Sequence, residues 1–278
     1  MNENEPLWLR DMIVLGHGAP NTLKKLGGRQ GRCVCLWSKE KGYCRIYPVP
    51  YQFLSDWQII DVKVIKSNTD NRKNSYAVYH YLEDWLDLGK NIQFHWTKTP
   101  RGKRIKKKLN RKEWIQLSKE LAKDTMSKII EEKESFGIIK PKNIDLILEQ
   151  NDKREKSGGQ LNLFAEDLDD LIMNQSDYRY IPKIVYDCEG ECTAKSQHKQ
   201  KIVSWEAYAY MKKNPDSLKH CEKIKKGYHI GDPNYEHYIL VGNIKNYPKS
   251  YIVVKLIRFK KEENKQEKED KHQTKLTQ

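Results

Sequence analysis

The residues best suited to chemistry lie in one stretch, DCEGECTAKSQHKQKIVSWE, which runs from position 187 to position 206. Cys188, Cys192 and His198 place two thiols and an imidazole close together along this stretch. Zinc prefers such sulfur and nitrogen ligands, and a structural zinc ion takes four of them in a tetrahedron. The spacing is not that of a CxxC knuckle. The three residues therefore predict an incomplete zinc site, with one ligand to be supplied from elsewhere.

The fourth ligand is expected on the following helix, where His220 and Cys221 are the candidates, Cys221 being the one we assign. Two other interpretations stay open. The stretch could be a polar connection between a strand and a helix, whose cysteines pack as small hydrophobic side chains. It could also be catalytic, with His198 as acid, base or ligand and with Glu206 or Glu191 as its carboxylate partner.

No other part of the sequence carries a convincing catalytic set. The chain contains neither GxSxG nor HExxH. Asp61 and Lys63 form a D-x-K pair on one face of an expected strand, which is a weak echo of nuclease motifs and common by chance. We therefore lean toward a protein without catalytic activity. A metal-dependent nuclease or phosphodiesterase built on the Cys/His/Glu residues remains the alternative.

A run of positive charge precedes this stretch. In KTPRGKRIKKKLNRK, residues 98–112, nine of fifteen residues are Lys or Arg and none is acidic. A solvated helix face would intersperse acidic residues, whereas cations bracketed by aromatic side chains suit contact with a nucleic-acid backbone. The alternative is a basic loop with no specific role. The predicted contact residues are Lys98, Arg101, Lys103, Arg104, Lys106, Lys107, Lys108, Arg111 and Lys112, with Trp96 and Trp114 as stacking residues.

The bulk composition fits a soluble polyanion-binding protein. The formal net charge is +14, and 32% of the residues are charged against 37% hydrophobic. No apolar run is long enough for a membrane span, and the first residues show no signal peptide. Six cysteines in such a chain are expected to be reduced or metal-bound, which predicts a cytoplasmic protein. Cys33 and Cys35 lie on one face of an expected strand and are predicted to be small core residues.

The pattern of apolar residues predicts an α+β fold with a β-rich, barrel-like N-terminal unit and a smaller mixed α/β C-terminal unit. A long connecting helix is expected over residues 111–134, where apolar residues recur at helical spacing. We expect four segments, namely the N-terminal domain at 1–140, a linker at 141–177, the C-terminal domain at 178–260 and a disordered tail at 261–278.

Several motifs resemble a poorly characterised family of prokaryotic proteins that occurs near defence and mobile-element genes. The motifs are CVCLWSKEKGYCRIYPVPYQFL near the start, CEGECTAKSQHKQKIVSWE in the centre and YILVGNIKNYPKSYIVVKL near the end. They correspond to that family's "vC.aGi…W.RlYPvPfr.L", "C…C.GH…i.DWE" and "fvGn…P.s..iv.l" patterns. The resemblance spans roughly residues 11–259. It supplies no established activity.

The resemblance implies that the central residues occupy motif positions in this chain. The matching residues are Cys188, Cys192, His198, Trp205 and Glu206. The sequence departs from the pattern at Gln197, where the family has glycine, and at Ser204, where it has aspartate. If that aspartate is catalytic in relatives, its loss argues against activity here.

These observations predict a nucleic-acid-binding component of a prokaryotic antiviral-defence or mobile-element system, with DNA or RNA as the ligand and a protein partner encoded nearby. Contact with about five phosphates would make the logarithm of the affinity fall with the logarithm of salt concentration at a slope of roughly −4 to −5. A second alternative is an adaptor subunit that uses the basic run to bind an acidic protein surface.

Overall fold

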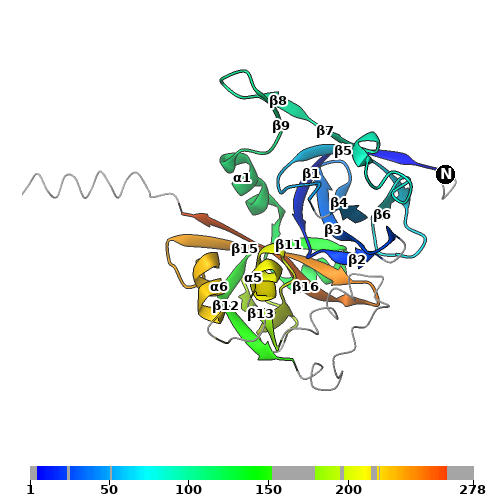
Figure 1. Cartoon of the computed structure of the whole chain (residues 1–278). Coiled ribbons are helices and arrows are strands. Elements are labelled where there is room, and N and C mark those ends of the chain that lie inside the picture. Colours follow the sequence, from blue (N-terminus) through cyan, green and yellow to red (C-terminus); the bar gives the residue numbers. More distant parts are fainter. Residues whose placement is uncertain are drawn as a thin grey trace, which may run out of the picture.

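The computed structural model shows a strand-rich α+β protein (Figure 1). It describes residues 5–23, 26–50, 52–151, 179–194, 197–213, 218 and 220–261. Most of the expected linker at 141–177 and the expected disordered tail at 261–278 lie outside the described residues. Among the helices that are described, none is both long and apolar enough to cross a membrane.

The N-terminal part is a seven-stranded sheet that closes on itself. Alternating apolar residues form the strands of the barrel, because one face of each of them lies inside it and carries mainly Val, Ile, Leu and Met side chains. The strands are β1 (Leu7–His17), β2 (Asn21–Leu23), β3 (Arg29–Ser38), β4 (Gly42–Pro50), β5 (Ile59–Lys66), β6 (Ser75–Val78) and β7 (Ile92–Phe94). A short 3₁₀ helix, η2 (Leu88–Lys90), precedes β7.

Five of these strands form the barrel, in the order β1-β3-β4-β6-β5 and back to β1. All neighbours are antiparallel except β4 and β6, which are parallel. Counted along the chain, this order is 1-2-3-5-4-1, which is the arrangement of an OB-fold barrel. The expected barrel-like N-terminal unit is therefore confirmed, and the strand order gives it a specific topology.

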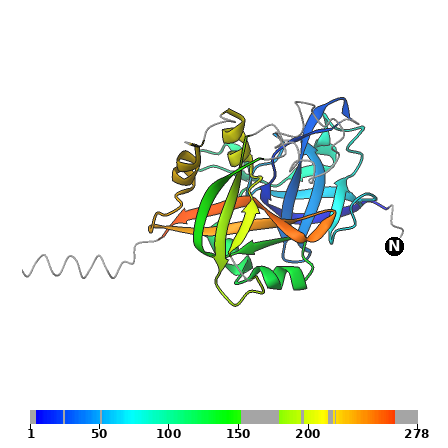
Figure 2. The same cartoon turned by 90° about the horizontal axis from the view of Figure 1, so that it is seen from below.

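The C-terminal part contains two further sheets around a second core, beside the barrel in Figure 2. A parallel bridge between Ile202 and Val253 links the end of one sheet to the middle of the other. The first sheet contains β10 (Ala122–Lys123), β11 (Phe136–Ile139), β15 (Tyr235–Ile244) and β16 (Tyr247–Lys260). The second contains β12 (Pro141–Gln150), β13 (Tyr180–Cys188) and β14 (His198–Lys201).

The long helix expected over residues 111–134 is a wrong prediction. Two helices occupy this stretch, α1 (Arg111–Leu121) and α2 (Met126–Glu131). Between them Ala122 and Lys123 turn extended and pair with β11, and Thr125 caps the new helix by accepting a hydrogen bond from the Lys128 N–H. The helices separate because α1 packs into the core between barrel and sheet, whereas α2 packs into the C-terminal core.

Two more helices, α5 (Trp205–Lys213) and α6 (His220–Tyr228), contribute side chains to the C-terminal core. Strand pairing crosses the expected domain border at residue 140. Strands β10 and β11 already belong to the C-terminal sheet, and β12, expected in the linker, pairs with β13 along its length. These pairings join residues far apart in the chain, so local composition does not reveal them.

The barrel and the C-terminal sheet share a buried junction. Along β3, Val34 and Leu36 point into the barrel, while Cys33 and Cys35 face outward into a core shared with residues of β11, β15 and β16. The expected core role of Cys33 and Cys35 is thus confirmed. OB barrels commonly bind oligonucleotides on the face of their second and third strands. Here the corresponding face, on β3 and β4, packs against the rest of the same chain.

Candidate nucleic-acid interface and metal centre

Most of the basic run forms a hairpin that projects from the body of the protein, as Figure 1 shows. Its strands are β8 (Trp96–Lys98) and β9 (Arg104–Lys106), which pair with each other and form a separate two-stranded sheet. Thr99 holds the turn, because its hydroxyl accepts a hydrogen bond from the Lys103 N–H at 3.1 Å. Gly102 has a φ of +76°, a left-handed conformation that glycine adopts without strain.

Among the described residues, the cations of the run have no carboxylate partner. Within the part of the chain that the structure describes, none of the nine Lys and Arg side chains between positions 98 and 112 forms a salt bridge. Partial burial and the neighbouring charge of Lys108 lower the pKa of Lys106. Lysines elsewhere find carboxylates, as Lys128 does with Asp124 at 2.7 Å. The run therefore offers positive charge that the described part of the protein leaves uncompensated.

Aromatic rings support two of these cations. The Arg104 guanidinium lies 4.4 Å from the ring centre of Trp96, and the Lys106 ammonium lies 3.4 Å from that of Phe94. Such cation–π contacts hold charged groups without neutralising them. Trp96 keeps 46% of its surface exposed, so it remains available as a stacking residue.

Trp114, the second predicted stacking residue, is differently placed. Its ring stacks on Trp57 with ring centres 5.3 Å apart and meets Phe259 edge-on at 5.8 Å. These contacts pack it against the core between barrel and sheet. The aromatic residues flanking the run in sequence therefore have different surroundings, one exposed on the hairpin and one packed at the junction.

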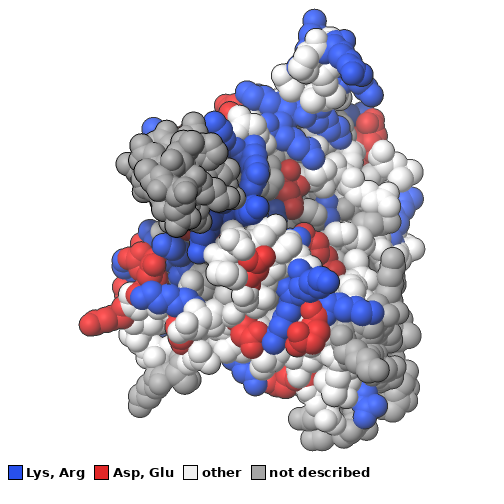
Figure 3. Space-filling model, turned by 90° about the vertical axis from the view of Figure 1, so that its left-hand side faces the viewer, with Lys and Arg blue, Asp and Glu red and all other residues white. Residues whose placement is uncertain are grey.

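The basic run continues from the hairpin back to the body of the protein. Backbone hydrogen bonds join the Ile59 N–H to the Lys107 carbonyl at 3.2 Å and the Leu109 N–H to the Trp57 carbonyl at 2.9 Å. Residues 107–109 thus lie along the barrel, and Arg111 begins α1. In Figure 3 the Lys and Arg side chains form a band that descends from the hairpin along this side of the molecule.

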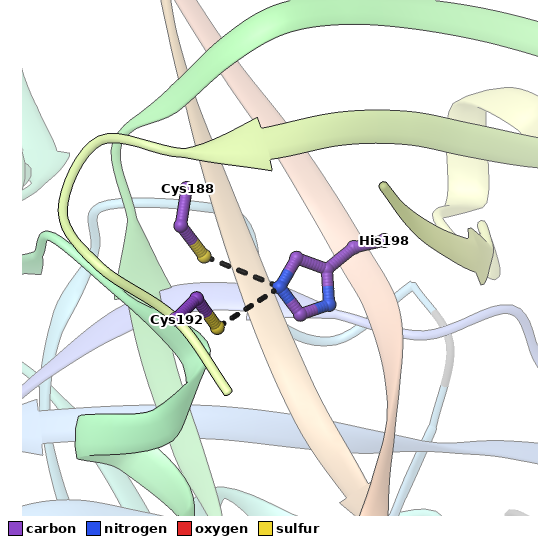
Figure 4. A group of neighbouring side chains, drawn as sticks. All are labelled: Cys188, Cys192 and His198. Atoms are coloured by element: carbon purple, nitrogen blue, oxygen red, sulfur yellow. Dashed lines mark hydrogen bonds between the residues drawn. The ribbon is translucent and has the colours of Figure 1, made fainter. Parts of the chain in front are cut away.

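The structure brings Cys188, Cys192 and His198 together as a group that could hold a metal ion. The Nε2 atom of His198 lies 3.2 Å from the sulfur of Cys188 and 3.3 Å from that of Cys192 (Figure 4). Around a tetrahedral zinc ion, a sulfur and a nitrogen ligand would be about 3.6 Å apart. The side chains therefore need to move by only a few tenths of an ångström. The end of β13 and the start of β14 position them, and Tyr186 stacks on the imidazole.

The two thiols differ in their ionisation. Burial raises the pKa of Cys188 to about 11. Burial acts in the same direction on Cys192, but hydrogen bonds from Ser127, from the Ala194 backbone and from His198 outweigh it and lower the pKa to about 6. One sulfur is therefore disposed to be a thiolate at neutral pH. A bound cation would favour deprotonation of the other as well.

Neither Cys221 nor Glu206 joins this group. The Cys221 thiol instead donates a hydrogen bond to the Leu146 carbonyl at 3.2 Å. Glu206 lies 3.5 Å from the Tyr228 hydroxyl and 3.9 Å from Arg258, on another part of the surface. The predicted fourth ligand is thus not assembled with the other three. The proposed pairing of His198 with Glu206 as catalytic residues is not assembled either, and the His220 side chain lies outside the described residues.

A second group of side chains that could hold a metal ion consists of Asp11, Asp61 and His95. Asp61 accepts hydrogen bonds from Arg10 at 2.8 Å and from the Asp11 N–H at 2.9 Å, and lies 3.0 Å from His95. Through these contacts Asp61 on β5 links the β1 residues Arg10 and Asp11 to His95, which connects β7 to the hairpin. Sequence reasoning noted Asp61 only for its spacing to Lys63, and nothing in the local pattern indicated His95 as its partner.

The fold and these sites define a class of protein in which an OB-type barrel with a cationic hairpin is joined to a C-terminal α+β unit carrying a Cys₂His group. The chain belongs to the family described as a domain of unknown function, DUF8757, which matches residues 116–276. Residues 9–116 match a second domain of unknown function, DUF8758. A search of curated proteins finds no match.

Proposed function

We propose that this protein binds nucleic acid through the phosphate backbone, using the β8–β9 hairpin and the basic segment that follows it. The observation that carries the proposal is the absence of any described salt bridge to nine clustered cations. Like charges held close together repel one another, and a polyanion relieves that repulsion while releasing its own counterions. Trp96, exposed and already in contact with Arg104, would stack on a base.

The covered barrel face supports the choice of this surface. A ligand on the face of β3 and β4 would have to displace the C-terminal sheet, since both sides of β3 are buried. The β8–β9 hairpin, by contrast, can contact a nucleic-acid strand without any rearrangement of the protein. The resemblance to proteins near defence and mobile-element genes supports a role in such a system, with a protein partner encoded nearby. Ser204, where the family has aspartate, supports a role without catalysis.

The test compares two charge reversals of equal size. Lys103, Lys107 and Lys108 are changed to Glu in one variant, and three exposed lysines that pair with carboxylates are changed in the other, namely Lys41, Lys90 and Lys128. Binding to single-stranded and duplex DNA and RNA is measured by fluorescence anisotropy over a salt series. We expect the first variant to weaken binding at least about 30-fold and to reduce the salt slope by about 3, and the second to change binding little.

Binding that is insensitive to salt, or equal in the two variants, would overturn the proposal. An adaptor that uses the same cations to bind an acidic protein surface would be indicated by a co-purifying partner that survives nuclease treatment. Cleavage of any substrate with Mg²⁺, Mn²⁺ or Zn²⁺, abolished by His198→Ala, would favour the nuclease alternative.

For the Cys/His group we propose a zinc ion held by Cys188, Cys192 and His198. A structural role needs a fourth ligand beyond these three, which the group does not supply. Two sulfurs and one nitrogen at these separations match the ligands of zinc. The Met126 N–H lies 3.4 Å from the Cys188 sulfur and the Ser127 hydroxyl 3.3 Å from that of Cys192. A metal here would thus fasten the turn between β13 and β14 to the start of α2.

The metal content of the purified protein tests whether Cys188, Cys192 and His198 bind zinc. Inductively coupled plasma mass spectrometry of protein purified from zinc-supplemented cells should find about one zinc ion per chain. Cys192→Ser and His198→Ala should lose it, while Cys221→Ser, which alters a thiol outside the group, should retain it. Wild-type protein without zinc, or zinc retained by His198→Ala, would contradict the assignment.

A further inference from the structure

A cavity of about 350 Å³ opens where the barrel, α1 and the C-terminal unit meet. Its volume lies in the range of small-ligand sites, so it admits a group of about nucleotide size and excludes a duplex. The walls come from five separate parts of the chain. They include Asp56 and Trp57 of the barrel, Arg111 and Trp114 of α1, Glu206 of α5, His229 and Tyr235, and residues 255–260 of β16.

The charges in this cavity leave a positive excess. Lys255 is paired with Asp56, and Arg258 lies 3.9 Å from Glu206. Arg111 and Lys260 also line the cavity, and neither forms a salt bridge among the described residues. With each carboxylate matched to one cation, two cations remain for a ligand. A guanidinium and an ammonium together suit a phosphate group, the first through its fork of donors and the second as a point charge.

The aromatic side chains of the cavity favour a phosphate over a base. One face of Trp57 lies against Trp114, and the Lys255 ammonium lies 4.6 Å from the centre of the same ring. His229 and Tyr235 stack on each other with ring centres 3.8 Å apart. These rings are largely engaged with neighbours, so they form walls and leave the unpaired cations as the groups with binding capacity.

The cavity is also continuous with the proposed nucleic-acid surface. Residues 107–109 run beside residues 57–59, and Trp57 lines the cavity. Arg111 belongs both to the basic run and to the cavity wall. A strand whose backbone follows the hairpin toward α1 is therefore led to this opening, where only its end would fit.

We propose that the cavity binds the terminal phosphate of a nucleic-acid strand whose backbone lies on the hairpin. This inference rests on the proposed function. A terminal phosphate monoester carries up to two negative charges at neutral pH, compared with one for each internal diester, so two uncompensated cations favour the end over the interior. The protein would then distinguish phosphorylated from unphosphorylated ends.

The experiment measures dissociation constants for single-stranded oligonucleotides of one sequence with a 5′-phosphate, a 3′-phosphate or hydroxyl groups at both ends. One phosphorylated form should bind wild-type protein at least about 10-fold more tightly than the hydroxyl form. In the double variant Arg111→Ala, Lys260→Ala this ratio should fall close to one. Lys261→Ala, a matched exposed cation next to the cavity but not in its wall, should keep the wild-type ratio.

The hairpin variant separates the two proposals. Charge reversal at Lys103, Lys107 and Lys108 should weaken all three oligonucleotides and preserve the ratio between them. Equal affinities of wild-type protein for all three would overturn the end-binding inference while leaving backbone binding intact. If no strand binds at all, the proposed function fails. A nucleoside monophosphate titrated by calorimetry then tests the cavity alone, and no heat, or heat unchanged in the double variant, overturns the inference.

Discussion

Two sets of cations in this molecule differ in burial and in their hydrogen-bond partners. Arg45 and Arg72 are buried at the junction between barrel and C-terminal sheet, with 1% and 9% of their surfaces exposed. Arg45 donates to the Ser135 carbonyl at 3.1 Å and to the Asn243 side chain at 3.2 Å, and Arg72 donates to the Asn243 carbonyl at 2.7 Å. The hairpin cations are exposed, apart from the half-buried Lys106, and form no ion pair among the described residues. Net charge alone would treat the two sets as equivalent.

The difference shows which positive charges serve the fold. A buried guanidinium loses its hydration and must recover hydrogen bonds from the protein, so removing it leaves acceptors unpaired. An exposed cation keeps its hydration and contributes little to stability, but it remains free to attract an anion. Stability and binding should therefore respond to different substitutions. Ordered by their effect on stability, the following changes test that separation.

The largest loss is expected at Arg45. Arg45→Met keeps much of the side-chain volume but removes the donors to Ser135 and Asn243, and it ends the contact with the Phe136 ring at 4.1 Å. The free energy of unfolding should fall by about 3 kcal/mol or more, measured by urea denaturation. Arg104→Met on the hairpin, the control, should change it by less than about 0.5 kcal/mol. If both variants lost similar amounts of unfolding free energy, buried and hairpin cations would not differ in their contribution to stability.

Asp56 should give a smaller loss that depends on pH. Burial would raise the pKa of this carboxyl, but the charge of Lys255 and the hydrogen bond from His17 lower it below its ordinary value. Because the folded-state pKa is the lower one, the unfolded chain binds more protons as the solution is acidified. The stabilisation is therefore fully present above about pH 4, starts to decline below that value and is lost only as pH falls through the lower folded-state pKa.

Asp56→Asn should accordingly lower the free energy of unfolding by about 1–3 kcal/mol at pH 7, and by a smaller amount that declines steadily as the pH is lowered toward 3. Denaturation curves recorded across this pH range provide the measurement. A loss that stays constant with pH would show that packing, and not the charge of Asp56, accounts for the effect.

Removing the hairpin tip should affect binding far more than stability. Replacing residues 98–104 with an Asn-Gly turn between Thr97 and Ile105 preserves the pairing of those two residues. The deleted side chains are exposed except for the half-buried Thr99, so the free energy of unfolding should change by less than about 1 kcal/mol. Affinity for a single strand should fall at least about 10-fold, because four cations are lost. A stable variant with wild-type affinity would exclude the hairpin as the contact surface.

A single exposed lysine should produce the smallest change. Lys107→Ala should leave the free energy of unfolding within about 0.5 kcal/mol of wild type and should reduce the salt slope of binding by about 0.7 to 0.9. Lys128→Ala, which removes a lysine paired with Asp124, serves as the control and should leave the slope unchanged. Equal slopes for all three proteins would mean that Lys107 touches no phosphate.

The sequence predicted those parts of the fold that rest on local patterns. Alternating apolar residues indicated the barrel strands, and the two-residue spacing of Cys33 and Cys35 indicated a shared buried face. The helix over 111–134 failed because Ala122 and Lys123 pair with β11, a long-range contact that overrides helical periodicity. The position of β11 in the C-terminal sheet depends on its pairing with β15, about a hundred residues away, which no local signal reports.

The candidate site shows the same division. Cys188, Cys192 and His198 lie close in sequence and were predicted together, and the structure brings them together. Cys221 was assigned to them by nearness along the chain, but α6 carries it to β12 instead. The terminal-phosphate cavity had no sequence signature, because its walls are gathered from positions between 56 and 260.

The two family matches meet at residue 116, inside α1, and not in a loop. Just before that point Trp114 contacts Trp57 from the barrel and Phe259 from β16. One turn of α1 therefore packs against both the barrel and the C-terminal unit. Cutting the chain at residue 116 would yield two fragments, each with exposed apolar surface that packs against the other in the intact protein. Co-expressed, such fragments are expected to reassociate, because each exposes apolar surface that the other covers in the intact protein.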